Sequence, residues 1–288
     1  GGDCLNTGCV PSKALIRSAK FLSEAKKSKN LGIKSASVDF EFSDIMDRVQ
    51  RVIKTIEPHD SVQRYTSLGV DCLSGEAQLI TPWEIEVSLN DGTRKKITAK
   101  NIIVATGAGP LLPPIEGMRE IDFLTTDSLW KLRELPEKFL VLGGGPIGSE
   151  LAQSFARLGS NVTLIEMAPK ILIREDSDVS DYVEQKFKSE GIRLLTSHKA
   201  KAFKKVNEKN FLIAENEGKE VEVEFDKILV ALGRSANVKG FGLEELGVTL
   251  TNRKTINVDP FLRTNFPNIF ACGDVAGPYQ FTHVAAHQ

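Results

Sequence analysis

The sequence predicts an α/β fold built on a parallel β-sheet, and neighbouring features in the middle of the chain carry that prediction. An apolar strand is expected at Phe139–Leu142, a helix at Ser149–Leu158 and a second strand at Asn161–Glu166. A glycine-rich loop, Gly143–Gly148, joins the first strand to the helix. A strand, a helix and a strand in this order form a βαβ unit, whose two strands run parallel through a right-handed crossover.

The loop fits the G-x-G-x-x-G pattern of dinucleotide-binding loops. Gly143 allows the tight turn, Gly145 lets a pyrophosphate approach the backbone, and Gly148 lets helix and strand pack closely. Glu166 ends the second strand 23 positions after Gly143. A carboxylate there binds the ribose 2′-OH and repels a 2′-phosphate, so the pattern predicts NAD rather than NADP. The alternative is a structural glycine turn followed by a solvated glutamate.

Periodicity and turn signals predict the remaining elements. Before the βαβ unit we expect a helix at Ser12–Lys29 with Pro11 in its first turn, a long helix from about 43 to 68 interrupted by Pro58, strands between 70 and 98 around the turn Asn90-Asp91-Gly92, and a short buried strand at Asn101–Thr106. After it we expect a helix at Val179–Glu190, antiparallel strands up to Phe225, and strands at Lys227–Ala231 and Ile269–Ala271.

Cys4 and Cys9 form the most informative motif. Two thiols with four residues between them can close a small ring, and the helix start marked by Pro11 favours the reactive thiolate. Lys13 lies one turn beyond Cys9 and can share its face. Half of a zinc site and two unrelated thiols are the alternatives. No second close Cys/His pair follows to complete a zinc site, so no metal site is predicted.

The other two cysteines, Cys72 and Cys272, lie alone in apolar surroundings and are expected to be small core residues. Four cysteines in 288 residues are too few for a secreted disulfide scaffold. One special pair in an otherwise cysteine-poor chain favours a reducing compartment, and we expect a cytoplasmic protein.

The composition excludes several classes of partner. The net charge is −1, which gives no basic excess for nucleic acid, and no run of about 18 apolar residues is present for a membrane span. The chain begins without Met and stops within an expected helix, so we expect it to be a piece of a longer protein.

Five motifs together resemble the pyridine nucleotide–disulfide oxidoreductases, the family of dihydrolipoamide dehydrogenase, glutathione reductase and mercuric reductase. The resemblance extends over essentially the whole chain. The motifs, in the family's order, are C-L-N-T-G-C-V-P-S-K at 4–13, A-T-G at 105–107, G-G-G-P-I-G-S-E at 143–150, A-L-G-R at 231–234 and A-C-G-D at 271–274.

The resemblance implies roles for the first and third motifs. Cys9 would be the thiol beside the flavin of a bound FAD, and Cys4 would exchange with substrate. Lys13 and Glu150 would pair near the flavin N5.

The resemblance also implies cofactor-binding roles for the remaining motifs. Thr106 and Gly107 would contact FAD, and Asp274 would hydrogen-bond its ribityl chain. A helix starting near Thr282 would direct its positive end at the flavin ring. Gly233, Arg234 and Gly273 are further cofactor-binding candidates.

The implied architecture is two Rossmann-like dinucleotide-binding domains of the three-layer ββα/βα type. Residues 1–115 would be an incomplete FAD-binding domain, residues 116–238 the NAD-binding domain, and residues 239–288 a return to the FAD-binding domain.

The chain departs from the family pattern in two ways. The family's first glycine fingerprint, which holds the FAD pyrophosphate, is absent from these 288 residues, as is the C-terminal interface domain with its His–Glu pair. None of His59, His198, His283 and His287 matches that pair. We therefore expect this stretch alone to hold FAD weakly and to be inactive, and the parent protein to be a homodimer.

The predicted activity of the parent is electron transfer between NAD(H), FAD and the Cys4–Cys9 disulfide, with a disulfide or dithiol substrate of the dihydrolipoamide type. Two alternatives stay open. One is a mercuric-ion reductase, and the other is a cofactor-free folding or binding unit.

Overall fold

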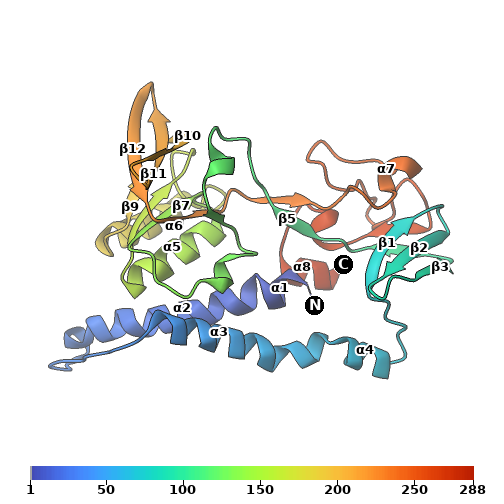
Figure 1. Ribbon diagram of the computed structural model, residues 1–288, viewed down its shortest axis with the longest axis horizontal. Coiled ribbons are helices and arrows are strands. Elements are labelled where there is room, and N and C mark those ends of the chain that lie inside the picture. Colours follow the sequence, from blue (N-terminus) through green and yellow to red (C-terminus); the bar gives the residue numbers. More distant parts are fainter. Residues whose placement is uncertain (1) are drawn as a thin grey trace. The chain divides into compact units, whose positions relative to one another are not determined.

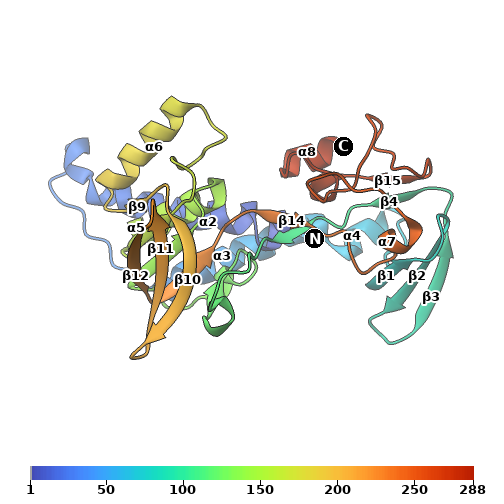
Figure 2. The same ribbon diagram turned by 90° about the horizontal axis from the view of Figure 1, so that it is seen from above.

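The computed structural model describes residues 2–288, which form two compact units. Within this range, unit 1 comprises residues 2–57 and 110–233, and unit 2 comprises residues 58–109 and 234–288. Figures 1 and 2 show the elements of both units from two directions.

Unit 1 is an α/β unit around a five-stranded parallel sheet, with strand order β6-β13-β7-β8-β9. Its helical segments are α1 (Asp3–Asn6), α2 (Cys9–Lys26), η1 (Ser28–Leu31), α3 (Phe42–Ile56), η3 (Met118–Glu120), η4 (Leu129–Lys131), α5 (Pro146–Leu158) and α6 (Ser177–Ser189). Its strands are β6 (Phe123–Leu124), β7 (Lys138–Leu142), β8 (Asn161–Ile165), β9 (Arg193–Leu195), β10 (Lys199–Val206), β11 (Lys209–Asn216), β12 (Lys219–Phe225) and β13 (Lys227–Val230).

The predicted βαβ unit is confirmed as β7, α5 and β8, with β7 and β8 parallel. Alternate side chains of β7 point to opposite faces of the sheet because the strand period is two residues. Phe139 and Val141 pack on the helical side, where Phe139 stacks on Phe155 of α5 with ring centroids 4.2 Å apart. Leu140 and Leu142 pack on the side of the antiparallel sheet β10-β11-β12. The sheet is therefore covered on both faces, in the ββα layering that the sequence predicts.

The helices α2 and α3 belong to unit 1 and lie side by side (Figure 1). Leu15 and Ala19 of α2 and Met46 and Val49 of α3 are buried in the same apolar cluster as Phe155. The boundaries of the two structural units therefore differ from the predicted domain boundaries. Residues 2–57 pack with the βαβ unit, whereas the prediction placed residues 1–115 together in an FAD-binding domain.

Unit 2 contains a two-stranded parallel sheet, a three-stranded antiparallel sheet and short helices. Its elements are α4 (Val62–Ser67), β1 (Gly75–Leu79), β2 (Glu84–Leu89), β3 (Arg94–Thr98), β4 (Ile102–Val104), β14 (Arg234–Ala236), α7 (Leu243–Leu246), β15 (Ile269–Ala271), η5 (Gly273–Val275) and α8 (Thr282–His287). Strand β5 (Ala108–Pro110) pairs with β14, and η2 (Glu57–Asp60) joins α3 to α4.

Two expectations for this part of the chain are confirmed and one is wrong. The long helix is interrupted at Pro58, and the turn at 90–92 joins the antiparallel strands β2 and β3. The strand β4 is buried on one face only, since Ile102 and Val104 are buried while Ile103 is 67% exposed. The predicted three-part assignment of cofactors to domains stays a prediction.

Candidate functional site

The two motif cysteines lie in one tightly folded segment at the start of α2. Cys4 is half-buried on α1, and Cys9 is the exposed first residue of α2. The intervening chain turns back sharply, because a Cβ on Gly8 would lie 3.0 Å from the carbonyl oxygen of Asp3 and 3.3 Å from Cα of Cys4. Glycine at position 8 thus lets the segment from Cys4 to Cys9 close on itself.

Lys13 reaches from α2 to α5. Its ammonium Nζ donates to both carboxylate oxygens of Glu150, at 2.8 and 2.7 Å. The two residues are 137 positions apart, and the packing of α2 on α5 brings them together. The side chains remain 60% and 39% exposed, so this is a surface pair with good geometry rather than a buried one.

The glycine loop Gly143–Gly148 lies at the end of β7 and the start of α5, as the pattern predicts. A Cβ on Gly148 would lie 1.9 Å from the carbonyl oxygen of Gly143, so only glycine permits this contact between turn and helix. Gly143 has φ +110°, and a Cβ there would lie 2.4 Å from the carbonyl oxygen of Ala231. No atom outside its chain neighbours lies within 4 Å of a Cβ position on Gly145, which leaves that residue open to a ligand. These residues fit a dinucleotide pyrophosphate.

Glu166 directly follows β8, and its carboxylate accepts hydrogen bonds from two backbone N–H groups. Oε2 accepts the N–H of Gly144 at 2.7 Å, and Oε1 accepts the N–H of Ala168 at 2.7 Å. A carboxylate has about four lone-pair positions, so each oxygen retains acceptor capacity for a ribose hydroxyl. Glu166 therefore orders the glycine loop, a contact that the sequence did not predict.

Thr106 and Gly107, which follow β4, are hydrogen-bonded to Asn237 within unit 2. The hydroxyl of Thr106 donates to the carbonyl of Asn237 at 2.8 Å, and Asn237 Nδ2 donates to the carbonyl of Thr106 at 2.9 Å. The backbone N–H of Asn237 donates to the carbonyl of Gly107 at 2.9 Å. Asn237 was missed by the sequence analysis, although it lies three positions after Arg234.

Asp274 pairs with Arg234 in the same unit. Arg234 Nε donates to Asp274 Oδ2 at 3.2 Å, and its Nη2 donates to the carbonyl of Ala108. The side chains are 12% and 21% exposed for Arg234 and Asp274, respectively. The A-L-G-R and A-C-G-D motifs, far apart in sequence, are thus joined through their last residues.

Three predicted glycines of these motifs adopt positive φ. Gly107, Gly233 and Gly273 have φ of +68°, +116° and +73°, a backbone conformation that other residues rarely adopt. Each therefore has a conformational reason to be glycine, whatever ligand it contacts.

Cys72 and Cys272 are half-buried, not core residues as the sequence analysis expected. Cys272 follows β15, whose Ala271 is buried, and Cys72 lies in the extended segment before β1. Short irregular segments leave one side of such residues open, and apolar neighbours in sequence do not reveal this.

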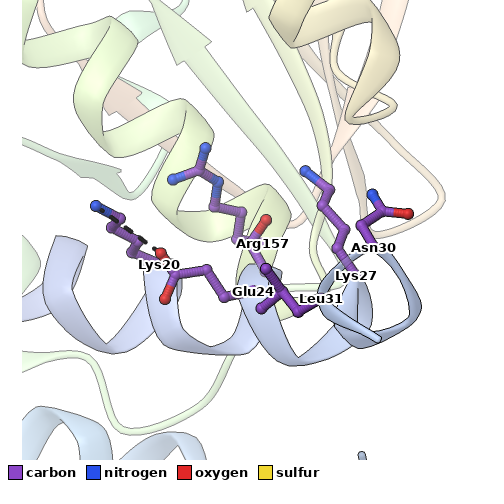
Figure 3. A pocket seen from close by; sticks show the side chains of 7 residues that line it. Lys20, Glu24, Lys27, Asn30, Leu31 and Arg157 are labelled. Carbon is purple, nitrogen blue, oxygen red and sulfur yellow. Dashed lines mark ion pairs between the residues drawn. The ribbon is translucent and has the colours of Figure 1, made fainter. Parts of the chain in front are cut away.

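A hollow of about 320 Å³ lies away from these residues, beside the C-terminal half of α2 (Figure 3). Figure 3 shows the Lys20–Glu24 ion pair on one side and Lys27 beside Asn30 on the other. Arg157 of α5 also lines it. None of the predicted site residues contributes to this hollow.

Arg157 instead belongs to a charge cluster around Glu190. The guanidinium donates to both carboxylate oxygens at 2.9 and 3.0 Å, and Lys186 and Lys27 lie 3.3 and 3.4 Å away. Burial by itself raises the pKa of Glu190, but hydrogen bonds and charges from Arg157 and Lys186 outweigh it and lower the pKa to about 2. The cluster links the end of α2, α5 and the end of α6 to one another, so its role is to stabilise the packing of these helices.

A sequence profile of the family described as pyridine nucleotide-disulphide oxidoreductase matches residues 1–288. The chain belongs to this family. The assignment made from five motifs is thereby confirmed, and the family places the chain among oxidoreductases.

Similar proteins carry two different names. A mercuric reductase of Streptomyces lividans is 34% identical over 287 residues, covering 99% of this chain and 60% of the relative. A dihydrolipoyl dehydrogenase of Mycobacterium bovis is 35% identical over 291 residues, covering 100% of this chain and 62% of the relative. The chain thus spans about 60% of the length of these relatives.

A solved structure shares the fold across the whole chain. The HOCl-induced flavoprotein disulfide reductase RclA from Escherichia coli matches with a TM-score of 0.83 and 27% identity, over 100% of this chain and 60% of that chain. The predicted α/β fold class is confirmed by this match.

Two negative findings complete the description. Between residues 2 and 288, no three His, Cys, Asp or Glu side chains come together as a metal site. No helix in the same range combines the length and apolar character that crossing a bilayer requires.

Proposed function

We propose that this chain is the redox-pair and nucleotide-binding part of an NAD- and FAD-dependent disulfide oxidoreductase. The observation that carries the proposal is the folded Cys4–Cys9 segment at the start of α2, in the same unit as the Lys13–Glu150 pair and the glycine loop. A disulfide reductase needs these three features together, whereas a binding module needs none of them as a set.

The thiol chemistry follows from the positions of the two cysteines. Cys9 is the exposed first residue of an 18-residue helix, and Cys4 is half-buried on the short helix before it. In our proposal the Cys4 thiolate attacks one sulfur of a substrate disulfide and displaces the other half as a thiolate. Cys9 then attacks Cys4 in that mixed disulfide, which releases the second substrate thiol and leaves the Cys4–Cys9 disulfide. Two electrons pass from the pair to the substrate.

The nucleotide would bind at the glycine loop. Gly145 leaves room for the pyrophosphate, Pro146 begins α5, and the helix start supplies unpaired N–H groups. Glu166 would accept the ribose 2′-OH and repel a 2′-phosphate. NAD is therefore the proposed nucleotide.

Thr106, Gly107 and Asp274 of unit 2 are the proposed FAD contacts, with Arg234 holding Asp274 in place. Their oxygens and backbone suit the hydroxyl-rich ribityl chain. When bound, FAD supplies the two-electron link between nicotinamide and a disulfide.

The first experiment tests the redox pair. Thiol counting on the chain with and without prior reduction should differ by two, and peptide mass spectrometry should place the bridge at Cys4–Cys9. The double variant Cys72→Ser/Cys272→Ser is the matched control and should keep that difference of two. If it abolishes the difference, or if a bridge joins Cys4 to Cys72, the proposal is wrong.

The nucleotide proposal has its own test. Glu166→Arg should shift preference from NADH toward NADPH by about tenfold or more, since one charged contact contributes on the order of 1–3 kcal/mol. Glu208→Arg makes the same charge change in the turn between β10 and β11, where the side chain is 91% exposed, and should leave the preference unchanged. Equal NADH and NADPH affinities in the unmodified chain would rule out the role of Glu166.

Reduction of a soft metal ion is a second candidate, because relatives named mercuric reductase are as similar as those named dihydrolipoyl dehydrogenase. Two neighbouring thiolates suit a soft ion as substrate. Adding Hg(II) or oxidised lipoamide to the parent protein together with excess NADH as the electron donor separates the two, since only the preferred substrate should support multiple turnovers of NADH oxidation.

A further inference from the structure

The peptide bond between Thr7 and Gly8 lies inside the segment that separates the two cysteines, and both of its polar groups are hydrogen-bonded. The N–H of Gly8 donates to the carbonyl of Asp3 at 2.6 Å. The carbonyl of Thr7 accepts the indole N–H of Trp130 at 3.0 Å. With one bond on each side, the plane of this peptide cannot rotate without breaking a hydrogen bond.

Trp130 is itself held in place. It lies on η4, just after β6 of the parallel sheet, and is only 6% exposed within the apolar cluster of unit 1. Its carbonyl accepts Gln50 Nε2 of α3 at 3.3 Å. Leu5, between the cysteines in sequence, is 3% exposed in the same cluster. The cysteine segment is thus fixed by a buried leucine and by one hydrogen bond from a rigid donor.

We propose that Trp130 is a positioning residue for the Cys4–Cys9 pair. Its indole N–H fixes the Thr7–Gly8 peptide so that the two sulfur atoms stay within reach of each other when reduced. This inference rests on the proposed function. It adds to the site a residue that lies 123 positions after Thr7 and belongs to none of the five motifs.

The physical consequence is a more stable disulfide. The equilibrium between a dithiol and its disulfide depends on the effective concentration of one thiol at the other, which a rigid connecting segment raises. Without the indole N–H, the carbonyl of Thr7 needs another hydrogen-bond donor. The segment therefore shifts until water can donate to this carbonyl. The two thiols then spend less time in bonding geometry.

Trp130→Phe tests this role, because it keeps a buried aromatic ring and removes only the N–H. The chain is equilibrated with glutathione redox buffers, in which reducing Cys4–Cys9 converts two glutathione thiols into one glutathione disulfide. Trapping thiols by alkylation and measuring masses gives the equilibrium constant. We expect Trp130→Phe to disfavour the disulfide about tenfold, which corresponds to a reduction potential about 30 mV less negative.

Two further variants make the outcome decisive. Trp83→Phe is the matched control, since Trp83 is 57% exposed in unit 2, and it should leave the equilibrium constant unchanged. Gln50→Leu removes the bond to the Trp130 carbonyl and should shift the constant in the same direction by two- to threefold. This variant also serves if Trp130→Phe fails to fold.

The results separate the two proposals. If the unmodified chain forms a Cys4–Cys9 disulfide and both Trp130→Phe and Gln50→Leu keep its equilibrium constant, the positioning role is wrong and the redox pair stands. If the unmodified chain forms no such disulfide in any buffer, the proposed function itself fails.

Discussion

Strands β7 and β4 both lead into a glycine turn of a predicted cofactor site, and their surroundings differ. Strand β7 has parallel neighbours on both edges, and its side chains are buried on both faces. Strand β4 pairs with β15 alone among the described elements, and Ile103 points away from its core at 67% exposure. The same local pattern of strand and glycine thus occurs with a strand buried on both faces in unit 1 and with a strand buried on one face in unit 2.

The two turns are also stabilised differently. The turn after β7 is held by steric contacts that exclude any side chain on Gly148, and by Glu166. The turn after β4 is held mainly by hydrogen bonds to Asn237, and a Cβ on Gly107 would meet no atom within 4 Å. The nucleotide turn of unit 1 is therefore the more rigidly specified.

The largest expected difference between the turns is in cofactor affinity. The chain should bind NADH at least tenfold more tightly than FAD, because unit 1 supplies a glycine fingerprint at a helix start and unit 2 supplies only Thr106, Gly107 and Asp274. Fluorescence titration of each cofactor measures this. Stoichiometric FAD that survives gel filtration would overturn the distinction between the units.

Substitutions within the glycine fingerprint test how rigidly the turn after β7 is specified. Gly148→Val should abolish NADH binding and lower the free energy of unfolding by about 1–3 kcal/mol or more, since its side chain would overlap the carbonyl of Gly143. Gly145→Ala should weaken NADH binding while leaving the thermal unfolding midpoint unchanged, because its Cβ meets no other atom. Equal effects of both on stability would contradict this account.

Matched truncations in the two strands test the difference in burial. Leu140→Ala in β7 should lower the free energy of unfolding by about 2–5 kcal/mol, because Leu140 is 1% exposed. Ile103→Ala in β4 should change it by less than about 0.5 kcal/mol. Urea denaturation measures both. A large loss for Ile103→Ala would mean that its exposed face is covered in solution.

A further prediction concerns acid stability in unit 1. The pKa of Glu190 is lowered to about 2 in the folded chain from an ordinary value of 4.5. Its contribution is therefore fully present above about pH 5 and is lost as the pH falls toward 2. Glu190→Gln should lower the free energy of unfolding at pH 7 by about 1–3 kcal/mol, and should flatten its decline between pH 5 and pH 2. Denaturant titrations across this range measure both changes, and an unchanged slope would show that the charge cluster contributes nothing.

Local sequence patterns were enough to predict the βαβ unit, the glycine loop, the break at Pro58 and the positions of the cysteine motif. All of these features depend on residues close together in sequence. The period of apolar side chains, the backbone freedom of glycine and the missing N–H of proline each act over a few positions. The motif order also determined the family.

The contacts between residues far apart in sequence could not be predicted and come from the packing of whole elements. The packing of α2 on α5 brings Lys13 to Glu150, and the burial of η4 brings Trp130 to Thr7. Ile103 is exposed although its strand reads as apolar, because tertiary packing decides which face of a strand another layer covers. Contacts over more than 100 positions depend on how faces of several elements pack together, and no local pattern in one element specifies them.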